Sequence, residues 1–264
     1  MKKNKAKEKL INGKPIIGTF QGFSSMDLTE MCGYLGYDFI ILDTEHGPMS
    51  AETCIPMICA AERTDMVPFI RVSENEKSYV LKALDVGAMG IIFPMISTAE
   101  DAKKAISLTK YIQKGNEKRK EFRGMVDISR AAGYGINNNL NRHIETSNNE
   151  IIIIAQFETK EAIENLDKIL KFPEIDVILI GSLDLSQSLG YPGEVENPLV
   201  KNVIKKAIKK IDNAGKAPGI VVPAPDAIKY WLDMGVKFFT YHQTYIIREA
   251  LENHLTKFKE ILQK

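Results

Sequence analysis

Residues 37–50 read Y-D-F-I-I-L-D-T-E-H-G-P-M-S, an apolar run that ends abruptly in ionisable side chains and a Gly-Pro turn. The apolar part, residues 39–42, has the continuous hydrophobicity of a strand buried on both faces, as in a parallel sheet covered by helices. Asp43, Glu45 and His46 therefore follow the C-terminal end of that strand. Because ligands bind at this edge of parallel α/β folds, the stretch predicts both a fold class and the place of a site.

The same unit, an apolar run followed by a helical pattern, recurs along the chain. Strand-like runs occupy residues 16–20, 39–42, 67–72, 90–94, 151–158, 176–180, 217–222 and 237–241. Helical patterns occupy residues 2–11, 26–35, 50–63, 77–84, 160–170, 198–213, 227–234 and 245–262, and a further helix opens at Thr98. Eight such strands in 264 residues predict an α/β fold of the (β/α)8 TIM-barrel type, which typically needs ~250 residues. A doubly wound open sheet is the alternative, but no nucleotide-binding glycine loop follows the first strand.

One segment interrupts the alternation. Residues 113–149 are polar, with a charged run, the segments R-G and S-R-A-A-G-Y-G, and a cluster of asparagines. A non-repeating excursion of this length in a compact domain is usually a functional loop or an assembly element. We therefore expect residues 1–264 to form a single barrel domain that carries this excursion.

Composition narrows the class of partner. Lys and Arg number 35 against 34 Asp and Glu, so no net charge favours nucleic acid or an anionic membrane. No apolar run approaches the ~20 residues of a membrane span, and the basic N-terminus lacks the apolar core of a signal peptide. We expect a cytoplasmic protein with a small-molecule substrate. The three cysteines, Cys32, Cys54 and Cys59, fit neither a disulfide framework nor a zinc site, and burial is expected for all three.

Six polar side chains fall at the C-terminal ends of predicted strands. They are Asp43, His46, Arg71, Gln156, Glu158 and Asp184. Since these ends meet at one mouth of a barrel, the six residues predict one shared site. Glu158 and Asp184 come from neighbouring strands, and two carboxylates without thiolate or imidazole partners suit a hard cation such as Mg²⁺ or Mn²⁺.

The remaining groups predict the chemistry. A metal ion together with Arg71 is what an enolate needs, because both meet charge that develops on a carbonyl oxygen. His46, close to Asp43 and oriented by Asp85 in this interpretation, is a candidate proton shuttle near neutral pH. No Lys lies at a strand end in an apolar setting, which argues against Schiff-base chemistry.

Longer segments carry a resemblance to a known family. They are G-Y-D-F-I-I-L-D-T-E-H-G-P, F-I-R-V, L-D-V-G-A-M-G-I-I-F-P-M-I, R-G, S-R-A-A-G-Y, A-Q-F-E-T, I-G-S-L-D-L-S-Q-S-L-G-Y-P-G and G-K-A-P-G-I. With these motifs, residues 12–262 resemble the metal-dependent class II pyruvate aldolases of the HpcH/HpaI type. That family includes 4-hydroxy-2-oxoheptanedioate aldolase and 2-dehydro-3-deoxyglucarate aldolase.

The resemblance implies a role for each polar residue. Glu158 and Asp184 would hold a divalent cation, Mg²⁺, Mn²⁺ or Co²⁺, whose shell the pyruvate oxygens complete. Arg71 would bind the ketone oxygen and stabilise the enolate, and Gln156 would line the pyruvate pocket. Backbone N–H groups around Leu183 and Asp184 would receive the pyruvate carboxylate.

Proton transfer at the aldol hydroxyl is the role implied for His46 with Asp85, and for Asp43 beside them. The implied reaction is the cleavage or formation of a 4-hydroxy-2-oxo acid, with pyruvate and an aldehyde as the smaller partners. Two alternatives remain open: a citrate-lyase-like enzyme acting on a CoA thioester, and a non-catalytic metabolite-binding barrel.

Two segments depart from the pattern of relatives. Many relatives have Pro-Ala where this chain has Ser182-Leu183, and Tyr241-His242-Gln243 replaces a Gly-Val-Asp type of run after the last strand. These changes leave the predicted metal and enolate groups in place and leave the aldehyde undetermined.

The resemblance also implies a homo-oligomer, since relatives assemble as hexamers. The closing helix, residues 245–262, carries a broad apolar stripe of helical period that must be buried somewhere. Burial on the chain's own barrel and burial in a subunit contact both remain open from the sequence.

Overall fold

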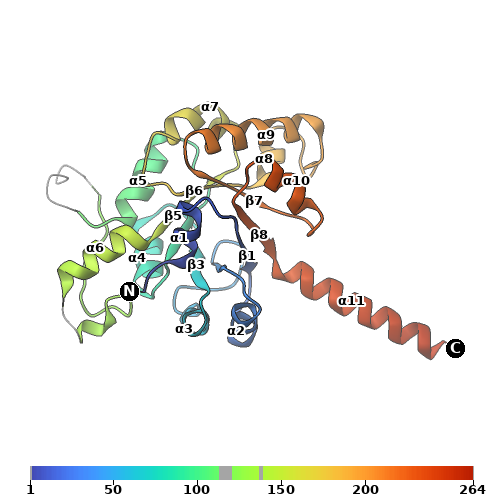
Figure 1. Ribbon diagram of the computed structural model, residues 1–264, viewed down its shortest axis with the longest axis horizontal. Coiled ribbons are helices and arrows are strands. Elements are labelled where there is room, and N and C mark those ends of the chain that lie inside the picture. Colours follow the sequence, from blue (N-terminus) through green and yellow to red (C-terminus); the bar gives the residue numbers. More distant parts are fainter. Residues whose placement is uncertain (1, 113–120, 137–138, 264) are drawn as a thin grey trace.

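Eight parallel strands close into a barrel in chain order, with β1 pairing both β2 and β8 (Figure 1). The computed structural model describes residues 2–112, 121–136 and 139–263. The strands are β1 (Ile16–Gln21), β2 (Phe39–Asp43), β3 (Val67–Arg71), β4 (Gly90–Phe93), β5 (Ile152–Phe157), β6 (Val177–Ile180), β7 (Ala217–Val221) and β8 (Phe238–His242). The predicted (β/α)8 barrel is confirmed, and every expected strand lies within one residue of its observed bounds.

Helices surround the barrel. They are α1 (Lys5–Ile11), α2 (Met26–Tyr34), α3 (Ile55–Arg63), α4 (Lys77–Asp85), α5 (Ala99–Thr109), the 3-10 turn η1 (Gly133–Gly135), α6 (Leu140–Glu150), α7 (Lys160–Ile169), α8 (Ser182–Ser188), α9 (Pro198–Asn213), α10 (Ala227–Asp233) and α11 (Gln243–Leu262). None of these described helices combines the length and hydrophobicity that crossing a membrane requires.

Two helices, α6 and α8, have no counterpart among the sequence predictions. Helix α6 lies in the segment predicted as a polar excursion, and it buries only Ser147, so it lacks the apolar stripe that marks a helix in sequence. The side chain of Asn139 caps it by accepting the N–H of Arg142. Residues 113–120 and 137–138 of the predicted excursion lie outside the described residues.

The two faces of each strand pack into different cores. Inside the barrel, the rings of Phe39 and Phe238 stack with centroids 4.3 Å apart, and Phe69 stacks on Phe39 at 5.2 Å. Gly18 leaves room for this packing, since a Cβ there would lie 2.3 Å from the Phe39 ring. Side chains of intervening positions, such as Ile40, pack outward against the helices. Because strand side chains alternate, the last inward positions of the strands point into the C-terminal mouth.

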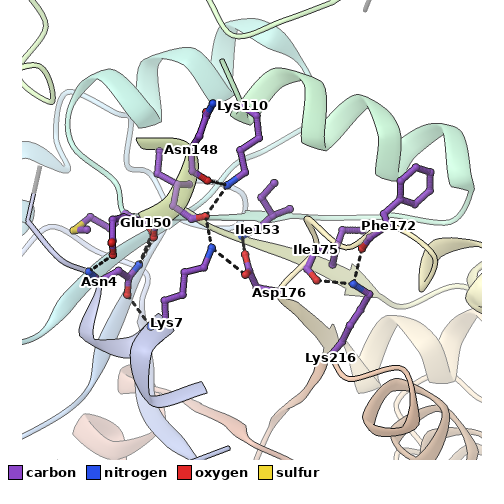
Figure 2. A network of polar contacts seen from close by, with 12 residues as sticks. Asn4, Lys7, Lys110, Asn148, Glu150, Ile153, Phe172, Ile175, Asp176 and Lys216 are labelled. Atoms are coloured by element: carbon purple, nitrogen blue, oxygen red, sulfur yellow. Dashed lines mark hydrogen bonds and ion pairs between the residues drawn. The ribbon is translucent and has the colours of Figure 1, made fainter. Parts of the chain in front are cut away.

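The opposite end of the barrel is closed by polar contacts around α1 (Figure 2). The side-chain amide of Asn4 donates to the carbonyl oxygens of Met89 and Glu150, both at 2.9 Å. Lys7 forms an ion pair with Asp176 at 3.1 Å. Met89, Glu150 and Asp176 precede β4, β5 and β6, so these contacts lie at the N-terminal ends of the strands. This closure leaves the C-terminal mouth as the end available to a ligand.

Helix α11 extends away from the barrel instead of packing on it (Figure 1). Every residue from Arg248 to Gln263 is exposed, including Leu251 at 65% and Phe258 at 63%. The predicted apolar stripe is therefore not buried on the chain's own barrel, and that alternative is wrong. The outer side of β1 is correspondingly open, with Ile17 41% exposed.

Two smaller expectations are also corrected. Cys32 and Cys54 are buried as predicted, but Cys59 is exposed and its sulfur accepts a hydrogen bond from Arg130 at 3.2 Å. Helix α3 begins at Ile55 rather than near residue 50, because residues 51–54 form turns.

Candidate active site

The centre of the mouth is an ion pair between neighbouring strand ends. Asp43 of β2 and Arg71 of β3 are paired in register and are only 4% and 5% exposed. Arg71 donates from Nε to Oδ1 of Asp43 at 2.9 Å and from Nη2 to Oδ2 at 2.6 Å. Burial raises the pKa of Asp43, but the hydrogen bonds and charge of Arg71 outweigh it and hold that pKa below its ordinary value. Asp43 thus fixes the guanidinium in one orientation.

Glu45 is a second acid against the same guanidinium. Its Oε2 lies 3.1 Å from Nη1 of Arg71, but this oxygen is buried and has no hydrogen bond of good geometry. Burial raises the pKa of Glu45, and the charges of Glu158 and Asp43 raise it further. The charge of Arg71 lowers this pKa but does not outweigh the other effects. The sequence marked Glu45 as part of the acidic motif but gave it no role. Its contact with Arg71 makes it part of the site.

Glu158 lies across the mouth, just after β5, and is 2% exposed. Its Oε1 accepts the N–H of Met95 at 2.7 Å, and its Oε2 accepts a hydrogen bond from the amide of Gln156. A Cβ at Gly181 would lie 2.6 Å from Oε2, so glycine at this position makes room for the carboxylate. Burial raises the pKa of Glu158 above its ordinary value, despite these hydrogen bonds, and the charge of Asp184 raises it further.

Asp184 and Leu183 lie in the first turn of α8, directly after β6. Both are exposed, and no side chain caps the start of this helix. Within the described residues no cluster of three or more His, Cys, Asp or Glu has the geometry of a metal site. Glu158 and Asp184 are two oxygen donors at this mouth, and the charge of Asp184 acts on Glu158. Their predicted role as metal ligands stays a prediction.

Gln156 points inward from β5 beside Glu158. Its amide nitrogen is used on Glu158, whereas its Oε1 is buried with no hydrogen-bond partner. Buried amide oxygens are normally satisfied, so this atom and Oε2 of Glu45 are polar positions that a bound ligand can satisfy. The contact of Gln156 with the substrate stays a prediction.

His46 and Asp85 do not meet within the described chain. The side chain of His46 is 67% exposed at the mouth, with Nε2 4.0 Å from Oε2 of Glu45. Asp85 is the last residue of α4, a helix that returns from β3 to the N-terminal end of the barrel. There its Oδ1 lies 4.0 Å from the buried Arg123. The expected orientation of His46 by Asp85 in the same chain is therefore wrong, because the topology puts them at opposite ends.

His242 is a site residue that the sequence reasoning noted only as a departure. It ends β8, and its ring stacks on Phe20 with centroids 4.7 Å apart and an interplanar angle of 15°. Burial lowers the pKa of His242, and the charge of Arg71 lowers it further, so both favour the neutral imidazole. The signal available in the sequence was its position directly after the strand-like run at residues 237–241.

The charges at the mouth are unbalanced. Among the residues that the structure describes there, Asp43, Glu45, Glu158 and Asp184 supply four carboxyl groups at the mouth against the guanidinium of Arg71. Burial is the main cause of the raised pKa values of Glu45 and Glu158, and the neighbouring acidic charges raise both further. Such a mouth favours a cation, and a cation with a guanidinium suits stabilisation of an oxyanion.

Comparison with known proteins identifies the family of this chain. The family model described as HpcH/HpaI aldolase/citrate lyase matches residues 17–241. A 2-keto-3-deoxy-L-rhamnonate aldolase of Escherichia coli (strain K12) is 33% identical over 258 residues, covering 97% of this chain and 93% of that protein.

Two solved structures extend the comparison. An HpcH/HpaI aldolase/citrate lyase family protein from Burkholderia cenocepacia J2315 superposes with a TM-score of 0.90 at 26% identity, covering 97% of this chain and 99% of that one. The citrate synthase SbnG superposes with a TM-score of 0.85 at 27% identity, covering 98% of each chain. The predicted resemblance and the assignment to the aldolases and lyases are confirmed. This chain belongs to the HpcH/HpaI aldolase/citrate lyase family.

Proposed function

We propose that this chain is a divalent-metal-dependent aldolase that cleaves or forms a 4-hydroxy-2-oxo acid through a pyruvate enolate. The observation that carries the proposal is the arrangement of Glu158, Asp184 and Arg71 at one mouth, where the charges of Asp184 and Arg71 both act on the buried Glu158. An enolate needs positive charge at its oxygen, and this mouth offers one fixed cation and the donors for another.

Glu158 and Asp184 fit a hard divalent cation, Mg²⁺, Mn²⁺ or Co²⁺. Both are oxygen donors, and two of them leave positions for substrate oxygens, as such cations require. The unpartnered Oε1 of Gln156 beside Glu158 adds a further polar atom. When bound, the cation supplies Lewis-acid polarisation of the ketone.

The protein side chains supply the remaining steps. Arg71, held by Asp43, binds the ketone oxygen and stabilises the charge that develops there as the bond between the pyruvate half and the aldehyde half breaks and the aldehyde leaves. His46, exposed at the mouth, exchanges a proton with the aldol hydroxyl. The unsatisfied backbone N–H groups at the start of α8, near Leu183 and Asp184, receive the carboxylate.

The direct test measures pyruvate release from a panel of 4-hydroxy-2-oxo acids, before and after treatment with a chelator. We expect release that chelation abolishes and that Mn²⁺, Co²⁺ or Mg²⁺ restores. Cleavage of a CoA thioester in place of the hydroxy-oxo acids would favour the citrate-lyase-like alternative. Binding of pyruvate without turnover of any substrate would favour a metabolite-binding barrel.

We also propose a homo-oligomer in which α11 of one subunit covers the barrel of another. The apolar side chains of α11 are exposed, and so are Ile17 of β1 and Leu35 after α2, where the last helix of a barrel normally packs. A second copy offers both surfaces reciprocally. The cytoplasmic location that the sequence predicts stays a prediction.

Static light scattering of the full chain at low micromolar concentration tests this assembly. We expect a mass of at least two subunits, and we expect Leu255→Glu to reduce it, since this change puts a charge in the apolar stripe. Lys257→Glu on the same exposed helix is the control and keeps the assembly. A monomer in the unmodified chain contradicts the proposal.

A further inference from the structure

The position of His242 places its ring inside the mouth. Strand β8 alternates, with Phe238 in the inner core, Phe239 in the outer core and Tyr241 packed against the outer core. By that period, His242 points inward. Its register partner is Phe20 of β1, the inward residue on which the imidazole stacks.

Phe20 connects His242 to the groups that would bind pyruvate. The guanidinium carbon of Arg71 lies 4.7 Å from the centroid of the same ring. Tyr245 contacts the imidazole edge-on from α11, with centroids 5.9 Å apart and an interplanar angle of 85°. The imidazole is therefore held in a fixed orientation by two aromatic rings, one contact away from Arg71.

The nitrogens of this imidazole are available. Among the described residues no hydrogen bond to either ring nitrogen occurs, and the side chain is half-buried at the mouth. The charged and titratable groups that act on it are Arg71, Asp43 and His46, all on the inner side of β2 and β3 or in the loop after β2. A neutral imidazole offers one donor and one acceptor, a match for a hydroxyl group.

The order of strands places His242 on the far side of the substrate. Glu158 and Asp184 follow β5 and β6, whereas β1, β2 and β8 form the opposite part of the closed barrel. A substrate whose pyruvate half lies at β5 and β6 and reaches Arg71 extends its other half toward β1 and β8. This is the half that becomes the aldehyde on cleavage.

We propose that His242 is a specificity-determining residue that hydrogen-bonds a hydroxyl group on the aldehyde half of the substrate. The inference rests on the proposed function and names the class of aldehyde, a hydroxylated one. An unsubstituted aldehyde leaves the ring nitrogens without a partner once water is excluded. A second carboxylate on this half is disfavoured by the four acidic groups of the mouth.

The test compares addition of pyruvate to glycolaldehyde and to acetaldehyde, which differ by one hydroxyl. In His242→Val we expect kcat/KM for glycolaldehyde to fall by about 10- to 100-fold, and for acetaldehyde by less than about threefold. His242→Asn keeps a donor and an acceptor, so we expect it to retain part of the preference for glycolaldehyde over acetaldehyde. Tyr241→Phe, on the outward-facing neighbour, is the matched control and leaves it unchanged.

Exchange of the pyruvate methyl protons with solvent separates a failure of the proposed aldolase function from a failure of the role proposed for His242. We expect exchange at the unmodified rate in His242→Val, which also shows that the variant folds. Equal losses for both aldehydes with exchange intact overturn the role of His242 alone. Absence of exchange in the unmodified, metal-supplemented protein overturns the proposed function and this inference with it.

Discussion

The polar contacts around α1 and the C-terminal mouth treat buried polar groups in opposite ways. The contrast concerns these two regions, because Oδ1 of Asp85 and the guanidinium nitrogens of Arg123, also toward the N-terminal end, are buried without a hydrogen-bond partner among the described residues. At the N-terminal end, the ammonium groups of Lys110 and Lys216 each donate to two backbone carbonyls, and Asn4 satisfies two more (Figure 2). At the C-terminal mouth, Oε2 of Glu45 and Oε1 of Gln156 are buried without a hydrogen-bond partner. Satisfied polar groups stabilise a fold, whereas unsatisfied ones mark where a ligand contributes the missing contacts.

Replacing a mouth carboxylate should therefore affect activity and stability in opposite directions. Glu158→Gln removes a predicted metal ligand, and we expect activity to fall by about 10³-fold or more, since the cation supplies several kcal/mol of charge stabilisation. The metal-free variant should unfold at an equal or higher temperature, because burial already disfavours the ionised Glu158. Pyruvate release and thermal unfolding are the two measurements.

Glu161→Gln provides the control for that variant, since Glu161 is an exposed glutamate in the first turn of α7. It should change neither property. A large loss of stability in metal-free Glu158→Gln would contradict the contrast between the two ends.

Arg71→Lys is expected to have the next largest effect. Lysine keeps the charge but loses the planar fork that donates twice to Asp43, so the enolate is stabilised poorly. We expect exchange of pyruvate methyl protons to slow by about 10²- to 10³-fold, as for loss of one preorganised donor. Exchange at the unmodified rate would show that Arg71 has another role.

Sequence alone predicted the strands well, and it predicted the helices around them and the side-chain contacts less well. Runs such as residues 151–158 are β-branched and continuous, so they are buried on both faces wherever they occur. The residues that end such runs, among them Asp43 and Arg71, must then meet at one mouth. Neither statement depends on long-range contacts, and both are confirmed.

Two kinds of contact could not be predicted from the sequence. One depends on the direction in which a helix runs through the fold, and the other on which surface covers an apolar stripe. Asp85 follows β3 closely in sequence, yet α4 takes it to the other end of the barrel, away from His46. The stripe of α11 shows which side chains are apolar, but helical period carries no information on what covers them. Glu45 was visible in the motif, and only the fold shows that it reaches Arg71.

A change in the polar contacts at the N-terminal end should lower the stability of the fold without lowering its activity. Asn4→Ala removes two side-chain hydrogen bonds to buried carbonyls and the cap of α1. We expect the free energy of unfolding to fall by about 2–4 kcal/mol, at roughly 1 kcal/mol for each of these contacts plus the unsatisfied carbonyls. Denaturant unfolding measures the loss, and kcat below the transition should stay the same.

Asn12→Ala, at the exposed end of the same helix, is the matched control and should be near neutral. A fall in kcat of the folded Asn4→Ala protein, in step with its stability, would mean that the two ends are coupled and not separate.

The smallest expected effect is a dependence of stability on pH that metal reverses. Burial raises the pKa of Glu45 and Glu158 above the ordinary 4.5, so the folded chain holds these protons more tightly than the unfolded chain does. Their contribution to stability is complete below 4.5 and is lost as pH rises through the folded values. The lowered pKa of Asp43 acts oppositely, but only as pH falls below its ordinary 3.8.

Chelated protein should thus unfold at a lower temperature at pH 7 than at about pH 5, as far as these two acids determine it. Added Mn²⁺ should reverse the slope, since the cation binds the ionised carboxylate and is displaced by protons. Thermal unfolding of the chelated and metal-loaded forms measures both slopes. In the double variant Glu45→Gln, Glu158→Gln the slope of the chelated form should flatten, and an unchanged slope there would assign the pH dependence to groups outside the mouth.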